Sequence, residues 1–254
     1  MEKDKKRFVS QLKTAFQDRE SVQKTELRDL FTQVFPGSGE NAFRRMLYYL
    51  EKNHIIQPLG AGMYALLFSA AASSKNRFIP ELSDGVRELY RSVHEAFPHT
   101  VFLIWETSEL FEFMLHQPAR KQILVEVEKD ASESFFNHIK SCPDRSVFYK
   151  PNRTIMDRYV LDTAESVLVL NLITQAPTIS IDGIVSAGLE KILVDLFADR
   201  ERYYMFQGEE LSHIYRTVFS EYWVNTRTMF RYAGRRNITE KLKKFIQTQV
   251  EIKI

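Results

Sequence analysis

The chain has 254 residues, 44% of them hydrophobic and 27% charged, which is enough for one large or two ordinary packed domains. Its single cysteine, Cys142, excludes an internal disulfide and a cysteine-based metal site. The longest apolar run, residues 63–72, is far shorter than the roughly 20 residues that span a bilayer, and the charged first ten residues do not resemble a secretory signal. We therefore expect a soluble globular protein of the cytoplasm, with no membrane association.

Charge is distributed unevenly along the chain. Residues 1–66 hold 11 Lys/Arg and 8 Asp/Glu, a net charge of +3, whereas residues 227–254 hold 8 and 2, a net charge of +6. The residues between them hold 16 basic and 23 acidic side chains, a net charge of −7. Basic ends around an acidic centre are typical of a protein that meets nucleic acid at one or both ends, although solvated surface produces the same asymmetry.

The first 37 residues predict two amphipathic helices joined by a short extended segment. Residues 4–16 place apolar side chains at helical spacing, and residues 21–23 are extended. The second helix follows Thr25, which can cap it, and Pro36-Gly37 ends it.

Residues 38–66 predict a third helix and a β-hairpin. Ser38 can cap this helix, whose apolar face repeats at spacings of three and four: Phe43, Met46, Leu47 and Leu50. The chain then becomes extended at Ile55-Ile56, and a Gly-Ala-Gly turn at residues 60–62 reverses it into residues 63–66. The order helix, short strand, helix, helix, hairpin is that of a winged helix, in which the third helix enters the major groove of DNA.

The outer face of the third helix carries the candidate DNA contacts. Arg reads guanine bidentately and Asn reads adenine, whereas hydroxyl and lysine side chains contact phosphates. We expect double-stranded operator DNA to be bound by Asn41, Arg44, Arg45 and Tyr48, with Lys24 and Arg28 as phosphate contacts. The alternative is a protein-protein interaction module, because winged helices also serve that role and Glu40 would repel phosphate where the helix enters the groove.

A composition change at residues 70–76 predicts a linker between two domains. We expect a DNA-binding domain at residues 1–69, a linker at 70–77 and a second domain at 78–254. Helices and strands alternate in the second domain, which predicts an α+β fold with a mixed α/β sheet, and nucleotidyltransferase-like topology is one candidate for it. From about residue 187 only helices are expected, as a C-terminal bundle. The expected strands are residues 100–105, 122–127, 146–149 and 167–173, and the expected helices before the bundle are 81–97, 108–114 and 132–139.

No recognised catalytic or cofactor motif occurs in the sequence. It lacks a Walker loop, a dinucleotide fingerprint and a nucleophile elbow, and no two of its six histidines stand at metal-ligand spacing on one element. We therefore expect no catalytic residue, no metal and no cofactor. The alternative is a metal-dependent nuclease or nucleotidyl-transferring enzyme that uses Glu106, Glu126 and Glu128, although Lys129 would lie on the opposite side of its strand from the last two.

Basic residues in the C-terminal half are candidates for binding phosphate or an acidic partner. Lys191 stands four residues before Asp195, a spacing that also forms an ordinary helix ion pair. Two arginines lie beside a helix break at residues 235–236. The candidate residues are Lys191, Arg231, Arg235 and Arg236.

Several motifs, taken in order, resemble the AbiEi-like antitoxin family of type IV toxin–antitoxin systems, and in particular an uncharacterised branch of it. They are GAGMYAL at residues 60–66, ILVEVEKD at 123–130, APT at 176–178, GLEKILVDLFAD at 188–199 and YAGRR at 232–236. The resemblance implies a bacterial transcriptional autoregulator that opposes a cognate nucleotidyltransferase-type toxin. It places Asn41, Arg44, Arg45 and Tyr48 on the recognition helix, implies no catalytic residue and leaves the oligomeric state open.

Overall fold

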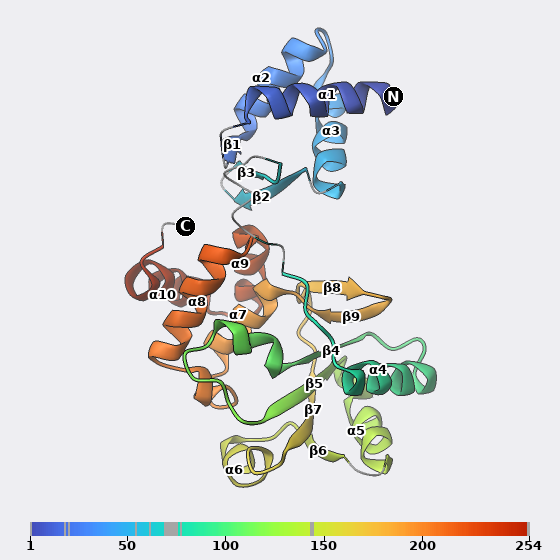
Figure 1. The fold of residues 1–254 in the computed structure, drawn as a ribbon. Helices are drawn as coiled ribbons and strands as arrows, with labels where there is room; N and C mark the ends of the chain where they lie inside the picture. Colours follow the sequence, from blue (N-terminus) through green and yellow to red (C-terminus); the bar gives the residue numbers. More distant parts are fainter. Residues whose placement is uncertain are drawn as a thin grey trace. The chain divides into compact units, whose positions relative to one another are not determined.

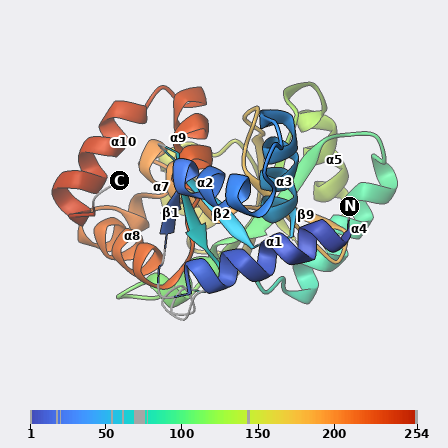
Figure 2. The same ribbon diagram turned by 90° about the horizontal axis from the view of Figure 1, so that it is seen from above.

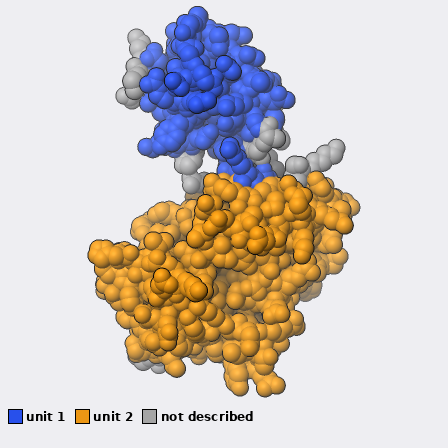
Figure 3. All heavy atoms as spheres, turned by 180° about the vertical axis from the view of Figure 1, so that it is seen from behind, with its two compact units in different colours: residues 1–77, 220–227 blue, residues 78–219, 228–254 orange. Residues whose placement is uncertain are grey.

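In the computed structural model the chain is a mixed α+β protein that divides into two units (Figure 3). The first unit comprises Met1–Arg77 and Ser220–Arg227, and the second comprises Phe78–Phe219 and Thr228–Ile254. The structure describes residues 2–17, 19, 21–53, 55–60, 62–68, 76, 78–142 and 145–252. Apart from Asn76, the linker expected at residues 70–77 lies outside the described residues.

Three helices and a small sheet form the first unit. The helices are α1 (Glu2–Ala15), α2 (Lys24–Val34) and α3 (Glu40–Lys52), and α1 packs against the other two (Figure 2). The strands are β1 (Ser21–Gln23), β2 (Ile56–Gly60) and β3 (Met63–Leu66), which form an antiparallel sheet in the order β1-β3-β2. The helices and the hairpin lie close to their expected positions because their apolar residues recur at the spacings that the core requires.

Aromatic rings fill the core of the first unit. Phe31 of α2 lies between Phe8 of α1 and Phe43 of α3, with ring centroids 5.4 and 5.5 Å apart. All three rings are buried. Rings at these separations contribute about 0.5–1.5 kcal/mol per pair beyond their burial.

Both helix caps expected in this unit are wrong. Helix α2 begins at Lys24, so Thr25 lies inside its first turn, and the backbone N–H of Gln23 donates to Glu26. Helix α3 is capped by Gly39. Ser38 belongs instead to the preceding turn, where its N–H donates to the carbonyl of Phe35.

A four-stranded mixed sheet forms the centre of the second unit (Figure 1). Its order is β4-β5-β7-β6, in which β4 is antiparallel to β5, and β5, β7 and β6 are parallel. The inner strand β7 is buried along most of its length, as its continuous apolar sequence predicts. The strands are β4 (Phe102–Glu106), β5 (Lys121–Val127), β6 (Ser146–Tyr149) and β7 (Glu165–Asn171).

The two faces of this sheet meet different elements. One face packs on α4 (Asp84–Ala96) and α5 (Ser132–Ser141) through residues such as Val125, Val93 and Phe135. Side chains alternate along a strand, so Glu126 points away from this cluster to the other face, where it meets α7 (Leu189–Ala198).

A second hairpin was not expected from the sequence. Strands β8 (Thr178–Ile181) and β9 (Ile184–Ala187) are antiparallel, and Asp182 and Gly183 join them with φ angles of 51° and 84°. Positive φ at both central residues is the geometry of a two-residue hairpin turn, for which Asp-Gly is a preferred sequence.

The remaining chain is helical, as expected. After α7 come α8 (Glu209–Glu221), α9 (Thr226–Arg235) and α10 (Thr239–Phe245). Short helical turns complete the second unit at Thr107–Phe113, Lys129–Ala131, Arg153–Ile155, Met156–Val160, Tyr204–Phe206 and Ile246–Val250. In the part of the chain that the structure describes, every helix is too short or too polar to traverse a bilayer.

Candidate functional site

Helix α3 separates its residues into a buried and an exposed face. Phe43, Met46, Leu47 and Leu50 are buried, as expected. The opposite face exposes all four candidate DNA contacts: Asn41, Arg44, Arg45 and Tyr48. Tyr48 is 66% exposed, which makes it one of the most exposed large hydrophobic residues described. The spacing of these four residues places them on one stripe of the helix.

A single carboxylate links the basic residues of α2 and α3. Glu40 lies 3.1 Å from Arg28 on α2 and 3.6 Å from Arg44 on α3. All three side chains are at least one-third exposed, so solvent screens these ion pairs and each contributes about 0–1 kcal/mol. Two guanidiniums share one carboxylate here, so this face keeps a net positive charge.

Arg45 and Lys24 have different surroundings. Arg45 is exposed and forms no ion pair with any described residue. Lys24 lies within electrostatic reach of Glu51, towards the other end of α3. Burial raises the pKa of Glu51, while Arg227, Tyr64 and Lys24 act in the opposite direction.

The three carboxylates of the alternative metal site do not converge. Glu106 pairs with Ile123 and Glu126 pairs with Leu103 across strands β4 and β5, so the two carboxylates lie on opposite faces of the sheet. Glu106 binds Lys121 at 2.9 Å and accepts from the backbone N–H of Ser83. Glu128 is exposed at the end of β5. Among the described residues, no group of three or more His, Cys, Asp or Glu side chains has an arrangement suited to a metal ion.

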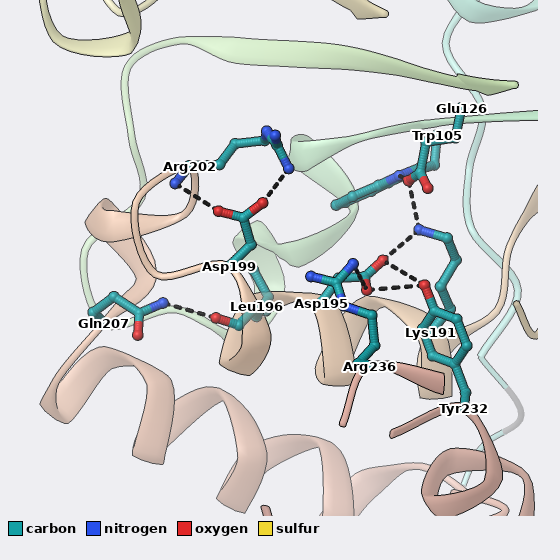
Figure 4. A network of polar contacts seen from close by, with 10 residues as sticks. All are labelled: Trp105, Glu126, Lys191, Asp195, Leu196, Asp199, Arg202, Gln207, Tyr232 and Arg236. Atoms are coloured by element: carbon teal, nitrogen blue, oxygen red, sulfur yellow. Dashed lines mark hydrogen bonds and ion pairs between the residues drawn. The ribbon is translucent and has the colours of Figure 1, made fainter. Parts of the chain in front are cut away.

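Lys191 is the centre of a buried charge cluster, shown in Figure 4. Its Nζ lies 2.5 Å from Glu126 Oε1 on β5 and 2.6 Å from Asp195 Oδ2 on α7. Burial alone would lower the pKa of Lys191, but the charges of Asp195 and Glu126 raise it, so the amine is an ammonium. Trp105 also donates to Glu126 Oε1, at 2.9 Å.

The C-terminal helices complete this cluster. The hydroxyl of Tyr232 donates to Asp195 Oδ1 at 3.0 Å, and Arg236 Nη1 lies 3.2 Å from the same oxygen. Burial, together with the charges of Asp195 and Glu126, raises the pKa of the Tyr232 hydroxyl, which therefore stays protonated. The two carboxylates face two cations, so the cluster is neutral overall and joins the sheet to α7 and α9.

The prediction that Lys191 binds phosphate or an acidic partner is therefore wrong. Its side chain is fully buried and both of its close partners are anions, so it is unavailable to a ligand in solution. Arg236 is largely buried and paired with Asp195. Arg235 is exposed and donates to Thr174, and Arg231 is exposed. These four residues do not form one surface site.

A further buried carboxyl lies close to the cluster. Glu109 is 8% exposed, and burial raises its pKa to about 8. Its Oε1 accepts from the backbone N–H of Glu106, whereas its Oε2 is buried without a hydrogen-bond partner among the described residues. At neutral pH this carboxyl is mostly protonated.

A comparison with protein families finds a match over most of the chain. A family model described as "Family of unknown function (DUF6577)" matches residues 42–252. No curated protein matches the chain significantly. The matched residues include α3 from Ala42 onward, the mixed sheet and the buried charge cluster.

Proposed function

The chain belongs to the DUF6577 family, whose function is unknown, and we propose that it is a DNA-binding transcriptional regulator. In this proposal the first unit is a winged helix. Helix α3 enters the major groove and the β2-β3 hairpin lies along the DNA backbone. The protein acts by binding and not by catalysis.

The observation that carries the proposal is the exposed stripe of α3. Asn41 and Arg45 are exposed and suited to base edges, and Arg44 lies beside them. Arg28 and Lys24 on α2 supply positive charge for phosphates. Glu40 holds Arg28 and Arg44 next to each other before DNA binds, and DNA phosphates would then compete with it for both guanidiniums.

We propose an antitoxin role for the second unit, on the basis of the resemblance to AbiEi-like proteins. The unit would oppose a cognate nucleotidyltransferase-type toxin, and the operator would lie upstream of the protein's own gene. The separation of Glu106 from Glu126 supports a binding role for this sheet over two-metal chemistry. Nucleotidyltransferase-like topology for this sheet stays a prediction.

The direct test is binding to DNA from upstream of the gene, measured by fluorescence anisotropy at several salt concentrations. We expect the double variant Arg44→Ala, Arg45→Ala to bind more weakly. Its plot of log K against log salt should flatten by about 0.9 for each phosphate that the variant no longer neutralises.

The matched control replaces two exposed arginines of the second unit, Arg91 and Arg158, by alanine. It removes the same charge from the protein but leaves α3 intact, so its DNA binding should stay close to that of the wild type. Equal binding by the two double variants would refute the assignment of α3 as the recognition helix.

A further inference from the structure

Three side chains where α5 meets β6 form a hydrogen-bonded cluster that DNA binding does not use (Figure 1 shows the two elements side by side). Ser132 is the first residue of α5, Tyr149 is the last residue of β6, and Lys150 follows it. Lys150 Nζ lies 2.7 Å from the Tyr149 hydroxyl and 3.2 Å from Ser132 Oγ. The two hydroxyl oxygens are 3.0 Å apart.

The number of available protons fixes the direction of these hydrogen bonds. Ser132 Oγ donates its only proton to the carbonyl of Lys129, at 2.8 Å. Ser132 must therefore accept from the Tyr149 hydroxyl, which in turn accepts from Lys150. Lys150 has three N–H donors and uses two of them, so one remains for a ligand.

The charge of Lys150 is not balanced within the cluster. Its two partners are neutral hydroxyls, and no carboxylate of the described residues forms an ion pair with it. The ammonium is half-buried and therefore less screened than a fully exposed lysine. Its backbone is left-handed, with φ of 45°. The charge of Glu133 acts on the neighbouring Tyr149 hydroxyl, but Glu133 forms no direct ion pair with Lys150. A half-buried ammonium without a directly paired carboxylate attracts an anion from solution.

An unused acceptor lies on the same face of the sheet. Tyr149 pairs with Val169 on β7, and Asn171 follows two residues later on the same face, one step closer to the carboxyl edge of the strands. Asn171 Oδ1 is buried and has no hydrogen-bond partner among the described residues. A hydrogen phosphate group that reached this amide oxygen would donate its proton to it.

We propose that Ser132, Tyr149 and Lys150, with Asn171, form a binding site for a phosphate group. Lys150 supplies the charge and the free N–H, Ser132 and Tyr149 hold the ammonium in place, and Asn171 accepts the ligand's proton. A single ammonium suits phosphate, which lysine recognises as a point charge, whereas carboxylates are bound most specifically by the planar fork of arginine.

Ligand binding at this site is linked to the ionisation of Tyr149. Hydrogen bonds with Lys150 and then Ser132 lower the pKa of Tyr149, and the negative charge of Glu133 opposes them. A phosphate bound to Lys150 adds negative charge beside the phenol. It should therefore raise the pKa of Tyr149, and by reciprocity phosphate should bind more weakly once Tyr149 has ionised.

The test uses the full-length protein and inorganic phosphate, with binding measured by isothermal titration calorimetry at constant ionic strength. We expect Lys150→Met and Lys150→Gly to weaken binding at least about tenfold, the loss expected for one charge-assisted hydrogen bond. Glycine adopts positive φ without strain, so Lys150→Gly keeps the backbone even if Lys150→Met does not fold.

The matched control is Lys140→Met. Lys140 is an exposed lysine that lies over the ring of Phe136 on α5, the helix that also carries Ser132, so its loss removes the same charge from a position outside the cluster. Phosphate binding should be unchanged in this variant. Equal phosphate affinity in the wild type and Lys150→Gly would overturn the proposal, as would acetate binding as tightly as phosphate.

A spectroscopic titration gives a second readout that a merely structural role would not change. Phenol ionisation at 295 nm, taken as the difference between wild type and Tyr149→Phe, reports on Tyr149 alone. Phosphate should shift this transition to higher pH in the wild type and leave it unchanged in Lys150→Gly. An unchanged transition in the wild type would overturn the proposal.

Discussion

Replacement of Lys191 by methionine should destabilise the second unit strongly. The substitution nearly preserves the volume of the side chain but leaves Glu126 and Asp195 buried with only Arg236 as a cation. At an effective dielectric constant of about 20, each lysine–carboxylate pair contributes roughly 6 kcal/mol of attraction, which desolvation largely offsets. Removal of one partner from a buried pair costs about 3–5 kcal/mol, a large share of a domain's total stability.

A second substitution separates charge from packing. In Lys191→Met, Glu126→Gln the remaining Asp195 and Arg236 balance each other, and the amide oxygen at position 126 still accepts from Trp105. We expect this double variant to recover at least half of the free energy of unfolding that the single variant loses. Recovery of this kind is not expected if the loss comes from packing alone.

The assay is urea denaturation followed by tryptophan fluorescence. The chain has two tryptophans, and Trp223 belongs to the first unit. In a Trp223→Phe background, fluorescence therefore reports on Trp105 beside the charge cluster. The reasoning is refuted if Lys191→Met loses less than about 1 kcal/mol, or if the double variant is as unstable as the single one.

The pH dependence of the stability lost in Lys191→Met gives an independent check. In the wild type, the raised pKa of Lys191 keeps its stabilisation complete below the ordinary lysine pKa of about 10.4, so it is constant between pH 5 and pH 8. In Lys191→Met the uncompensated carboxylates should have raised pKa values and bind a proton in the folded state as pH falls. The stability deficit should therefore shrink from pH 8 to pH 5.

Two further predictions concern the second unit. The pKa of Glu109 is about 8 in the folded protein, so the wild type should lose stability relative to Glu109→Gln as pH rises from about 4.5 to 8, by at most about 1.4 kcal/mol per pH unit. Urea titrations across this range measure the free energy of unfolding of both proteins. Parallel plots of this free energy against pH would contradict the prediction. Gly183→Ala should destabilise the protein by about 1 kcal/mol because the φ angle of Gly183 is 84° in the β8-β9 turn, whereas Gly183→Asn should destabilise it less. Thermal denaturation of both variants checks this, and equal melting temperatures for the two variants would contradict it.

Local periodicity was sufficient to predict most elements of the fold. The strand at residues 146–149 is confirmed at both ends, and the buried strand expected at 167–173 is confirmed at 165–171. The β8-β9 hairpin was missed, although Asp182-Gly183 between two alternating segments is a recognisable hairpin signal. The cap predictions failed although both residue types favour that position, because Ser38 belongs to the preceding turn and Thr25 already lies within the first turn of α2.

The charge cluster could be predicted only in part. The four-residue spacing of Lys191 and Asp195 suggested an ion pair, and the pair is confirmed, but its burial was not foreseen. Glu126 lies 65 residues before Lys191, and only the packing of α7 on the sheet brings them together. By contrast, the exposed residues of α3 followed from local spacing, because the apolar side of one helix determines which of its residues face solvent.

The discontinuous first unit has a consequence for how the protein is made. Ser220–Arg227 belongs to this unit, where Tyr222 forms a β-bridge with Asn76 and Arg227 acts on Glu51. During synthesis these residues emerge only after most of the second unit has been translated. The unit proposed to bind DNA therefore cannot complete its own set of contacts until the ribosome has passed residue 227. A fragment that ends at the linker would lack these contacts.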